Sequence, residues 1–227
     1  MTRLLRSAWL ITRKDLLIEV RSREILYTTL FFAVSCVLVF AFGFVDEGRA
    51  LEGAAAGILW IAIAFSGTLA LGRTFERERQ SETIRALLMT PADRPAIYLG
   101  KLAGVLMVLA SVEAIIVPLT ALMFQAPIFA HPLLMGGLLV TGTVGFAAVG
   151  TLFAAMLGRS RSRDVLLPVL LYPITIPVII AGVRGTAALL QPEVDLPMAR
   201  VWLSMLVFFD LVFVTLALWT FEPVMGE

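Results

Sequence analysis

The sequence predicts an all-α, polytopic membrane protein of one domain, residues 1–227, with six transmembrane helices. Of its 227 residues, 59% are hydrophobic and 15% are charged, whereas soluble domains carry roughly 45–50% apolar and about 25% charged residues. Six apolar segments of about 20 residues each match the length that a helix needs to cross a bilayer. Lysine and arginine gather in alternate connections between these segments, which is the pattern that sets membrane orientation.

The first 24 residues are predicted to form an amphipathic helix in the membrane interface. They hold six basic residues, and Leu5, Trp9, Leu16 and Val20 recur at roughly helical spacing. Tryptophan is favoured at the depth of the lipid headgroups. The basic residues either only mark the cytoplasmic surface or have a dedicated role, and the sequence leaves both interpretations open.

The six predicted transmembrane helices span residues 25–45, 53–72, 102–124, 133–157, 165–183 and 201–221. Their only charged residues are Glu113 and Asp210, which lie near the middle of the third and sixth spans. Charged groups at this depth are costly and normally face a bundle interior or a cavity. The two acids therefore either serve a pathway or gate, or are neutral acids hydrogen-bonded to another helix.

Three features refine the later spans. Gly150 and Ala154 form a small-xxx-small spacing in the fourth span, which favours close helix packing. Prolines interrupt the fifth span and are expected to kink it; they are Pro168, Pro173 and Pro177. Residues 184–200, with apolar patches and further prolines, suggest a short helix or a re-entrant piece at the outer face.

Residues 73–101 form the longest charged interval between two spans, and residues 73–95 within it are predicted to be a cytoplasmic hairpin. Glycine and proline are absent from Arg73 to Met89, which favours a helix, and Thr90-Pro91 ends it. The segment is either a solvated connection or a docking helix for a soluble ATPase, since mixed charges with apolar ends suit a protein surface. We assign ATPase coupling to one set of residues: Arg73, Phe75, Glu76, Arg77, Glu78, Arg79, Glu82, Leu87 and Leu88.

The basic residues predict the orientation of the chain. With the N-terminus in the cytoplasm, the three inner segments hold six, six and three lysines and arginines, fifteen in all, and the outer loops hold three. This asymmetry places both termini and the 73–95 hairpin in the cytoplasm.

The residue inventory argues against an enzyme. The sequence contains no GxxxxGK[ST] motif, so ATP hydrolysis has to come from another chain. A single histidine, His131, and a single cysteine, Cys36, offer no metal cage and no bis-histidine haem ligation. His131 is either a solvated loop residue or an axial ligand. We expect no catalytic, cofactor-binding or metal-binding residues, and the net charge of +1 offers no basic field for nucleic acid.

Two stretches carry a resemblance to a known family. The first is Lys14-Asp15-Leu16 with Glu19, followed by Arg21-Ser22-Arg23-Glu24. The second is Phe75-Glu76-Arg77-Glu78-Arg79, followed by Leu87-Leu88, Pro91 and Ile97-Tyr98-Leu99-Gly100-Lys101. With six spans, these stretches resemble ABC-2-type permeases and, more closely, the CcmB family, the haem exporter B subunits of cytochrome c maturation.

The resemblance implies a permease subunit in the bacterial inner membrane, present as two copies on a CcmA-like ATPase dimer. It also implies CcmC-like and CcmD-like membrane partners, with a CcmE-like chaperone that carries haem. ATP would bind the partner, haem would be handled by the complex, and hydrolysis would drive release of the haem-loaded chaperone. Two alternatives remain open: an ABC-2 exporter for a lipid, drug or polysaccharide, and a scaffold subunit that transports nothing.

Overall fold

A computed structural model describes residues 2–46, 49–50, 53–80, 94–157, 160 and 162–224. These residues form seven α-helices and one antiparallel pair of two-residue strands, β1 (Val45–Asp46) with β2 (Arg49–Ala50). The helices are α1 (Thr2–Ser22), α2 (Glu24–Phe44), α3 (Ala54–Gln80), α5 (Arg94–Met123), α6 (Pro132–Met156), α7 (Arg163–Leu190) and α8 (Leu196–Val224).

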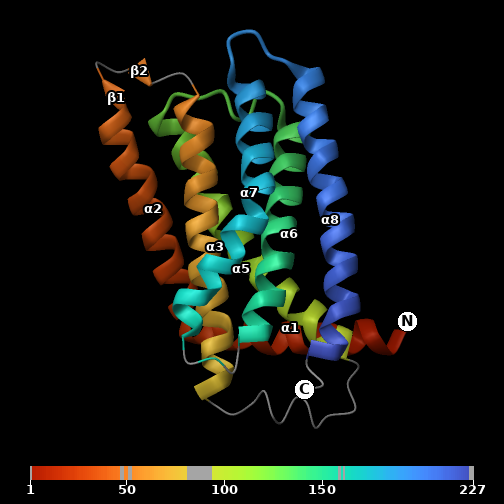
Figure 1. Cartoon of the computed structure of the whole chain (residues 1–227). Coiled ribbons are helices and arrows are strands. Elements are labelled where there is room, and N and C mark those ends of the chain that lie inside the picture. Colours follow the sequence, from red (N-terminus) through yellow and green to blue (C-terminus); the bar gives the residue numbers. More distant parts are fainter. Residues whose placement is uncertain are drawn as a thin grey trace.

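Six of these helices, α2, α3 and α5 to α8, are long and apolar enough to cross a membrane. They stand side by side as an upright bundle, while α1 lies across one end of it (Figure 1). We call this the α1 end and the opposite end, which carries β1 and β2, the far end. The predicted all-α fold of a multi-pass membrane protein with six spanning helices is confirmed.

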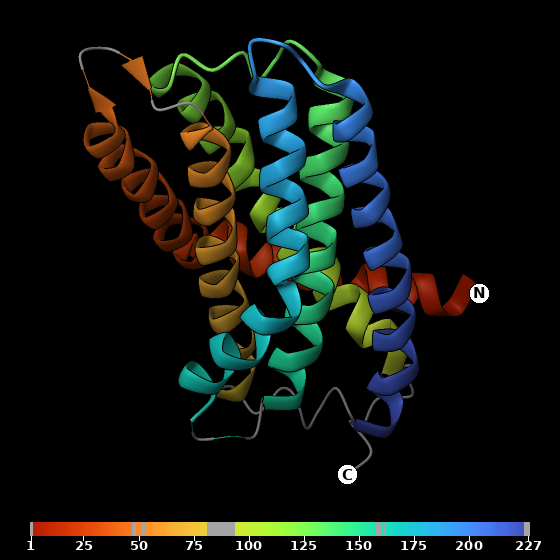
Figure 2. The same ribbon diagram turned by 45° about the horizontal axis from the view of Figure 1, so that its top comes forward.

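Helices α3 and α6 form the interior of the bundle: α6 packs against α3, α5, α7 and α8, and α3 packs against α2, α5, α6 and α7. Helices α2 and α8 lie at opposite flanks (Figure 2), and their large apolar side chains, such as Phe42 and Trp219, are mostly exposed. Such side chains suit the hydrocarbon of a bilayer. The chain therefore has a packed interior around α3 and α6 and an apolar outer surface.

Close packing in the interior depends on one large ring set between two glycines. Trp60 of α3 is buried, and its indole N–H donates a hydrogen bond of 2.9 Å to the Thr186 hydroxyl of α7. A Cβ atom at either Gly142 of α6 or Gly182 of α7 would overlap the ring. Lipid tails are as apolar as leucine, so membrane helices associate through such tight contacts of small residues.

One predicted element differs from the structure and one agrees with it. Helix α3 covers the predicted span 53–72 from Ala54 onward, and the helix expected from Arg73 onward is present up to Gln80, the last residue described there. Helix α7 continues to Leu190 and α8 begins at Leu196, so the predicted short or re-entrant segment at 184–200 consists of the ends of two long helices. Residues 184–190 include Ala187, Ala188, Leu189 and Leu190, which favour a helix.

The three prolines of α7 leave it one helix, but its first turns lean away from the line of the remainder (Figure 2). A proline removes one backbone hydrogen bond and its ring presses on the preceding turn. The expected kink is present in the half of α7 nearest the α1 end.

We predict that Gly142→Ala lowers the thermal unfolding midpoint of the detergent-purified protein. The Trp60 ring cannot retreat from the new methyl group because Gly182 holds its other side, and overpacking of this kind costs about 1–3 kcal/mol. The matched control is Gly136→Ala on the same helix, where no atom lies within 4 Å of the added Cβ. An equal midpoint for both variants would contradict the packing assigned to Trp60.

Candidate functional site

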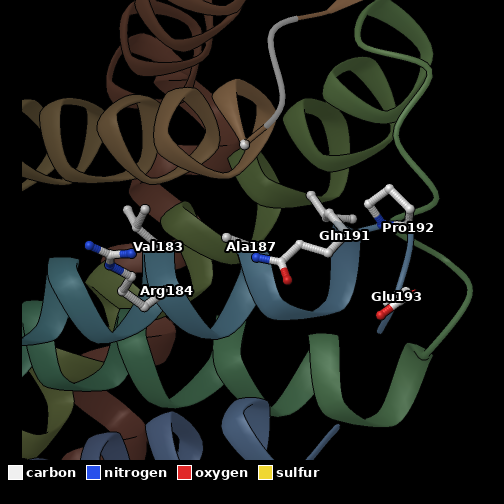
Figure 3. A pocket seen from close by; sticks show the side chains of 8 residues that line it. Val183, Arg184, Ala187, Gln191, Pro192 and Glu193 are labelled. Atoms are coloured by element: carbon white, nitrogen blue, oxygen red, sulfur yellow. The ribbon is translucent and has the colours of Figure 1, made fainter. Parts of the chain in front are cut away.

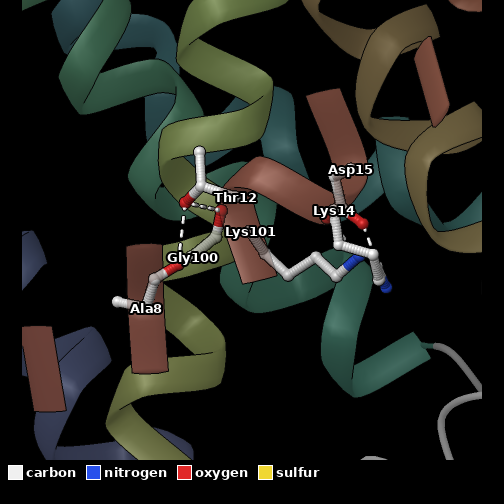
Figure 4. Close-up of polar contacts among 6 residues, drawn as sticks. All are labelled: Ala8, Thr12, Lys14, Asp15, Gly100 and Lys101. Carbon is white, nitrogen blue, oxygen red and sulfur yellow. Dashed lines mark hydrogen bonds and ion pairs between the residues drawn. The ribbon is translucent and has the colours of Figure 1, made fainter. Parts of the chain in front are cut away.

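The α1 end is held together by a close crossing of α1 over α5. A Cβ atom at Gly100 of α5 would lie 2.8 Å from Ile11 Cβ and 2.9 Å from the Ala8 carbonyl oxygen, so only glycine permits this approach. The Thr12 hydroxyl hydrogen-bonds to the carbonyl oxygens of Gly100, at 3.1 Å, and Ala8, at 2.9 Å (Figure 4). The two backbones therefore meet with almost no side chain between them.

A buried ion pair fixes the same crossing. Lys101 Nζ lies 2.6 Å from Asp15 Oδ2, and the two side chains are 2% and 16% exposed. Lys14 approaches the other carboxylate oxygen at 3.0 Å from the more exposed side of α1 (Figure 4). Removing a lysine and a carboxylate from water is costly unless they pair. Asp15 and Lys101 are therefore stable here only in this relative position, which sets the register of α1 on α5.

Further polar contacts connect the other helices at the α1 end. Glu19 of α1 accepts the backbone N–H of Leu26 in α2 at 2.8 Å, and Arg73 of α3 lies 3.5 Å from Glu24 of α2. Arg163, at the start of α7 and 3% exposed, donates to the Gly72 carbonyl oxygen of α3. The contacts of the α1 end thus reach α1, α2, α3, α5 and α7.

Of the residues assigned to ATPase coupling, Arg73 and Phe75 to Arg79 belong to the part of α3 that lies at this end of the bundle. Arg73 is exposed on α3 and pairs with Glu24. Five more residues, Phe75 to Arg79, continue α3, but their side chains lie outside the described part of the chain. Glu82, Leu87 and Leu88 fall in residues 81–93, which also lie outside it. That segment joins the end of α3 to the start of α5, so its two attachment points are described even though it is not.

The two intramembrane acids are not brought together. Glu113 of α5 accepts a hydrogen bond from the Thr143 hydroxyl of α6. Asp210 of α8 packs against Gly145 of α6, and its buried Oδ1 atom makes no hydrogen bond within the described residues. Because a helix turns about 100° per residue, Thr143 and Gly145 face nearly opposite sides of α6. The contact of Glu113 agrees with a structural acid, whereas Asp210 retains an unsatisfied oxygen.

His131 lies at the far end, where its backbone carbonyl accepts the N–H of Met135 at the start of α6. A cavity of about 750 Å³ opens at the same end between α3 and α7, and Arg184, Gln191 and Glu193 contribute exposed polar side chains to its wall (Figure 3). Among the described residues, no group of three or more His, Cys, Asp or Glu side chains could hold a metal ion. Asp15, Lys101 and Arg163 at the α1 end each have an ion-pair or hydrogen-bond partner on another helix.

From the sequence, Asp15 and Lys101 carried part of the family resemblance and Arg163 was a basic residue of an inner segment, and no structural role was assigned to any of the three. A usable signal was present for two of them. Gly100 and Gly104 have the GxxxG spacing of a close helix contact, with Lys101 between them. Thr12, Asp15 and Glu19 share one face of α1 with Ala8 and Ile11, which marks polar residues on a packing face. For Arg163 no comparable pattern exists.

We predict that Lys101→Met speeds chymotryptic cleavage after Trp9 of α1 in the purified protein. The change leaves the Asp15 carboxylate partly buried with Lys14 alone, at a cost of up to about 3 kcal/mol, the lower end for breaking a buried pair. Lys14→Met is the control, because Lys14 is 38% exposed and Lys101 still holds Asp15. If the two variants are cut at the same rate, the buried pair does not fix α1.

The chain is similar to known proteins along most of its length. The family model described as CcmB protein matches residues 6–224. The chain is 30% identical over 155 residues to heme exporter protein B of Paracoccus denitrificans, covering 68% of this chain and 70% of that protein. It is 25% identical over 170 residues to heme exporter protein B of Haemophilus influenzae, covering 75% and 76%. For the protein of that name from Escherichia coli, identity is 30% over 93 residues, covering 41% and 42%. With six spanning helices and a family match along nearly its whole length, the chain belongs to the CcmB family.

Proposed function

We propose that this chain is the membrane permease subunit of an ABC-type complex that handles haem for cytochrome c maturation. ATP is hydrolysed by a separate soluble ATPase, which docks at the α1 end on residues 73–95. The observation that carries this proposal is the convergence of helices at that end: the connection between α3 and α5 leaves and re-enters the bundle where polar contacts link five helices.

The α1 end suits the transfer of motion from a docked partner. A force on residues 81–93 acts on the last turns of α3 and the first turns of α5. The contact of Arg163 with Gly72 passes a displacement of α3 to α7, and the Lys101–Asp15 pair passes a displacement of α5 to α1. Rigid helices joined by discrete polar contacts are the elements through which such coupling travels.

The charge distribution supports a cytoplasmic position for the α1 end. Helix α1 begins and helix α8 ends at this end of the bundle (Figure 1), and fifteen of the eighteen lysines and arginines belong to segments next to it. In this orientation α1, the 73–95 segment and both termini face the cytoplasm of a bacterial inner membrane. Docking at this end gives the ATPase access to ATP.

The names of the relatives support haem as the cargo of the complex. In our proposal, haem is handled by the assembled complex rather than ligated by this chain, and ATP hydrolysis releases a haem-loaded CcmE-like chaperone. CcmC-like and CcmD-like subunits complete the complex around two copies of this chain on a CcmA-like dimer. An exporter of a lipid, drug or polysaccharide would instead assemble without the chaperone. A scaffold subunit would co-purify with the same partners in the presence and in the absence of ATP.

The double variant Glu76→Lys/Glu78→Lys tests the docking site. If these charges contact the ATPase, their reversal places like charges at the contact, and truncating or reversing buried interfacial charges costs roughly 2–5 kcal/mol. We expect loss of ATPase co-purification in detergent and of cytochrome c maturation, at an unchanged membrane level of the variant.

Glu193→Lys is the control for the double variant, since Glu193 is exposed and belongs to the connection between α7 and α8, which lies at the opposite end of the bundle from α1 (Figure 1). Normal co-purification of the ATPase with the double variant, together with normal cytochrome c maturation, would contradict docking on this segment.

The intramembrane acids give a separate prediction. Glu113→Leu and Asp210→Leu should insert normally, because each removes a group that costs on the order of 3 kcal/mol at the bilayer centre. If Asp210 serves a gate, cytochrome c yield falls in Asp210→Leu while the protein level is maintained. Glu113→Gln, which keeps an acceptor for Thr143, should retain the yield if Glu113 is structural. An unchanged yield in Asp210→Leu would assign a structural role to Asp210 as well.

A further inference from the structure

The surface of α1 that faces away from α5 is apolar. One side of the helix is buried on α5 through Ala8, Ile11 and Thr12. On the remaining surface several large apolar side chains are each more than half exposed: Leu5, Trp9, Leu10, Leu17 and Val20. A soluble surface seldom gathers that many exposed apolar side chains on a single helix without a partner.

Two arginines lie within this apolar surface. With about 3.6 residues per turn, Arg6 and Arg13 fall on one line along the helix. Trp9 and Val20 flank this line on one side, and Leu10 and Leu17 flank it on the other. Both arginines are exposed, and neither makes a hydrogen bond or an ion pair with any residue that the structure describes.

The position of α1 indicates what covers this surface. Helix α1 packs on the flank of α5 near the end of the membrane-spanning bundle (Figures 1 and 2). Its register is fixed there by Lys101 and Asp15, so the surface opposite α5 faces sideways, where the bilayer surrounds the bundle. A tryptophan and leucines beside arginines match the boundary between headgroups and acyl chains.

We infer that the Arg6–Arg13 surface of α1 binds the phosphate groups of anionic phospholipids. Trp9, Leu10 and Leu17 enter the upper acyl region of the bilayer. The methylene groups of the two arginines pack along these side chains, so that the guanidinium groups lie at the depth of the lipid headgroups. A guanidinium donates paired hydrogen bonds to phosphate oxygens, which lysine does not match. Two arginines on one line, two helical turns apart, engage the headgroup layer at two points. This inference does not depend on the cargo of the complex or on where its ATPase docks.

The test measures lipid retention by the full-length protein. The chain is purified and exchanged into nanodiscs that contain equal amounts of phosphatidylglycerol and phosphatidylcholine, and bound lipid is counted by native mass spectrometry after release. We expect retained phosphatidylglycerol in the wild type. In Arg6→Gln/Arg13→Gln the preference for phosphatidylglycerol should fall by roughly thirtyfold, the effect of losing two arginines at an anionic surface.

The matched control is Arg184→Gln/Arg200→Gln, which removes two exposed arginines at the far end. It should keep the wild-type preference. A second readout uses brominated phosphatidylglycerol, which quenches the fluorescence of a nearby tryptophan. The contribution of Trp9 is the difference in fluorescence between the wild type and Trp9→Phe. The brominated lipid should quench this contribution in the wild type and quench it less in Arg6→Gln/Arg13→Gln.

Two results would overturn the inference. One is an unchanged phosphatidylglycerol preference in Arg6→Gln/Arg13→Gln. The other is Trp9 fluorescence that the brominated lipid does not quench and that becomes shielded from water only when a soluble partner is added. That result would assign this surface to a protein. Since both arginines are exposed, the fold is preserved in these variants, and unaltered gel filtration of the double variant verifies this.

Discussion

The ion pair between Lys101 and Asp15 is the contact on which the α1 end depends. A lysine that is 2% exposed requires a carboxylate, and Asp15 is the carboxylate that α1 supplies. Because Gly100 brings the two backbones together just beside the pair, α1 cannot slide along α5 without separating the charges. The pair therefore fixes both the place of α1 and the direction in which its exposed surface points.

A second constraint acts inside the bundle. Helices surrounded by lipid gain little from burying leucine against leucine, so close contacts and hydrogen bonds decide how they pack. The Trp60 ring between Gly142 and Gly182, with its N–H bonded to Thr186, is such a contact, and it joins α3, α6 and α7. The α1 end is organised by an ion pair beside a close backbone contact, and the interior by the Trp60 ring between two glycines with its hydrogen bond to Thr186.

The fold could be predicted because the number of spans follows from the apolar segments that are long enough to cross a bilayer. The orientation of these spans follows from the basic residues of the connections. Element ends were less accessible: residues 184–190 and 196–200 belong to two long helices, although the apolar patches and prolines of 184–200 suggested a separate short or re-entrant segment. The site was least accessible. Asp15 and Lys101 are 86 residues apart, and nothing in either local sequence indicates the partner. Glu82, Leu87 and Leu88 lie outside the described residues, so their assignment to ATPase coupling stays a prediction.

The central claim is that a soluble ATPase engages the α1 end at the connection between α3 and α5. Site-specific photo-crosslinking in intact membranes tests it most directly, with a photoreactive amino acid at position 82 or, for comparison, at position 193 of the far end. We predict a crosslink to a soluble ATP-binding protein from position 82 whose yield changes when ATP hydrolysis is blocked, and none from position 193. A crosslink to that protein from position 193, or none from position 82 in an assembled complex, would contradict the account.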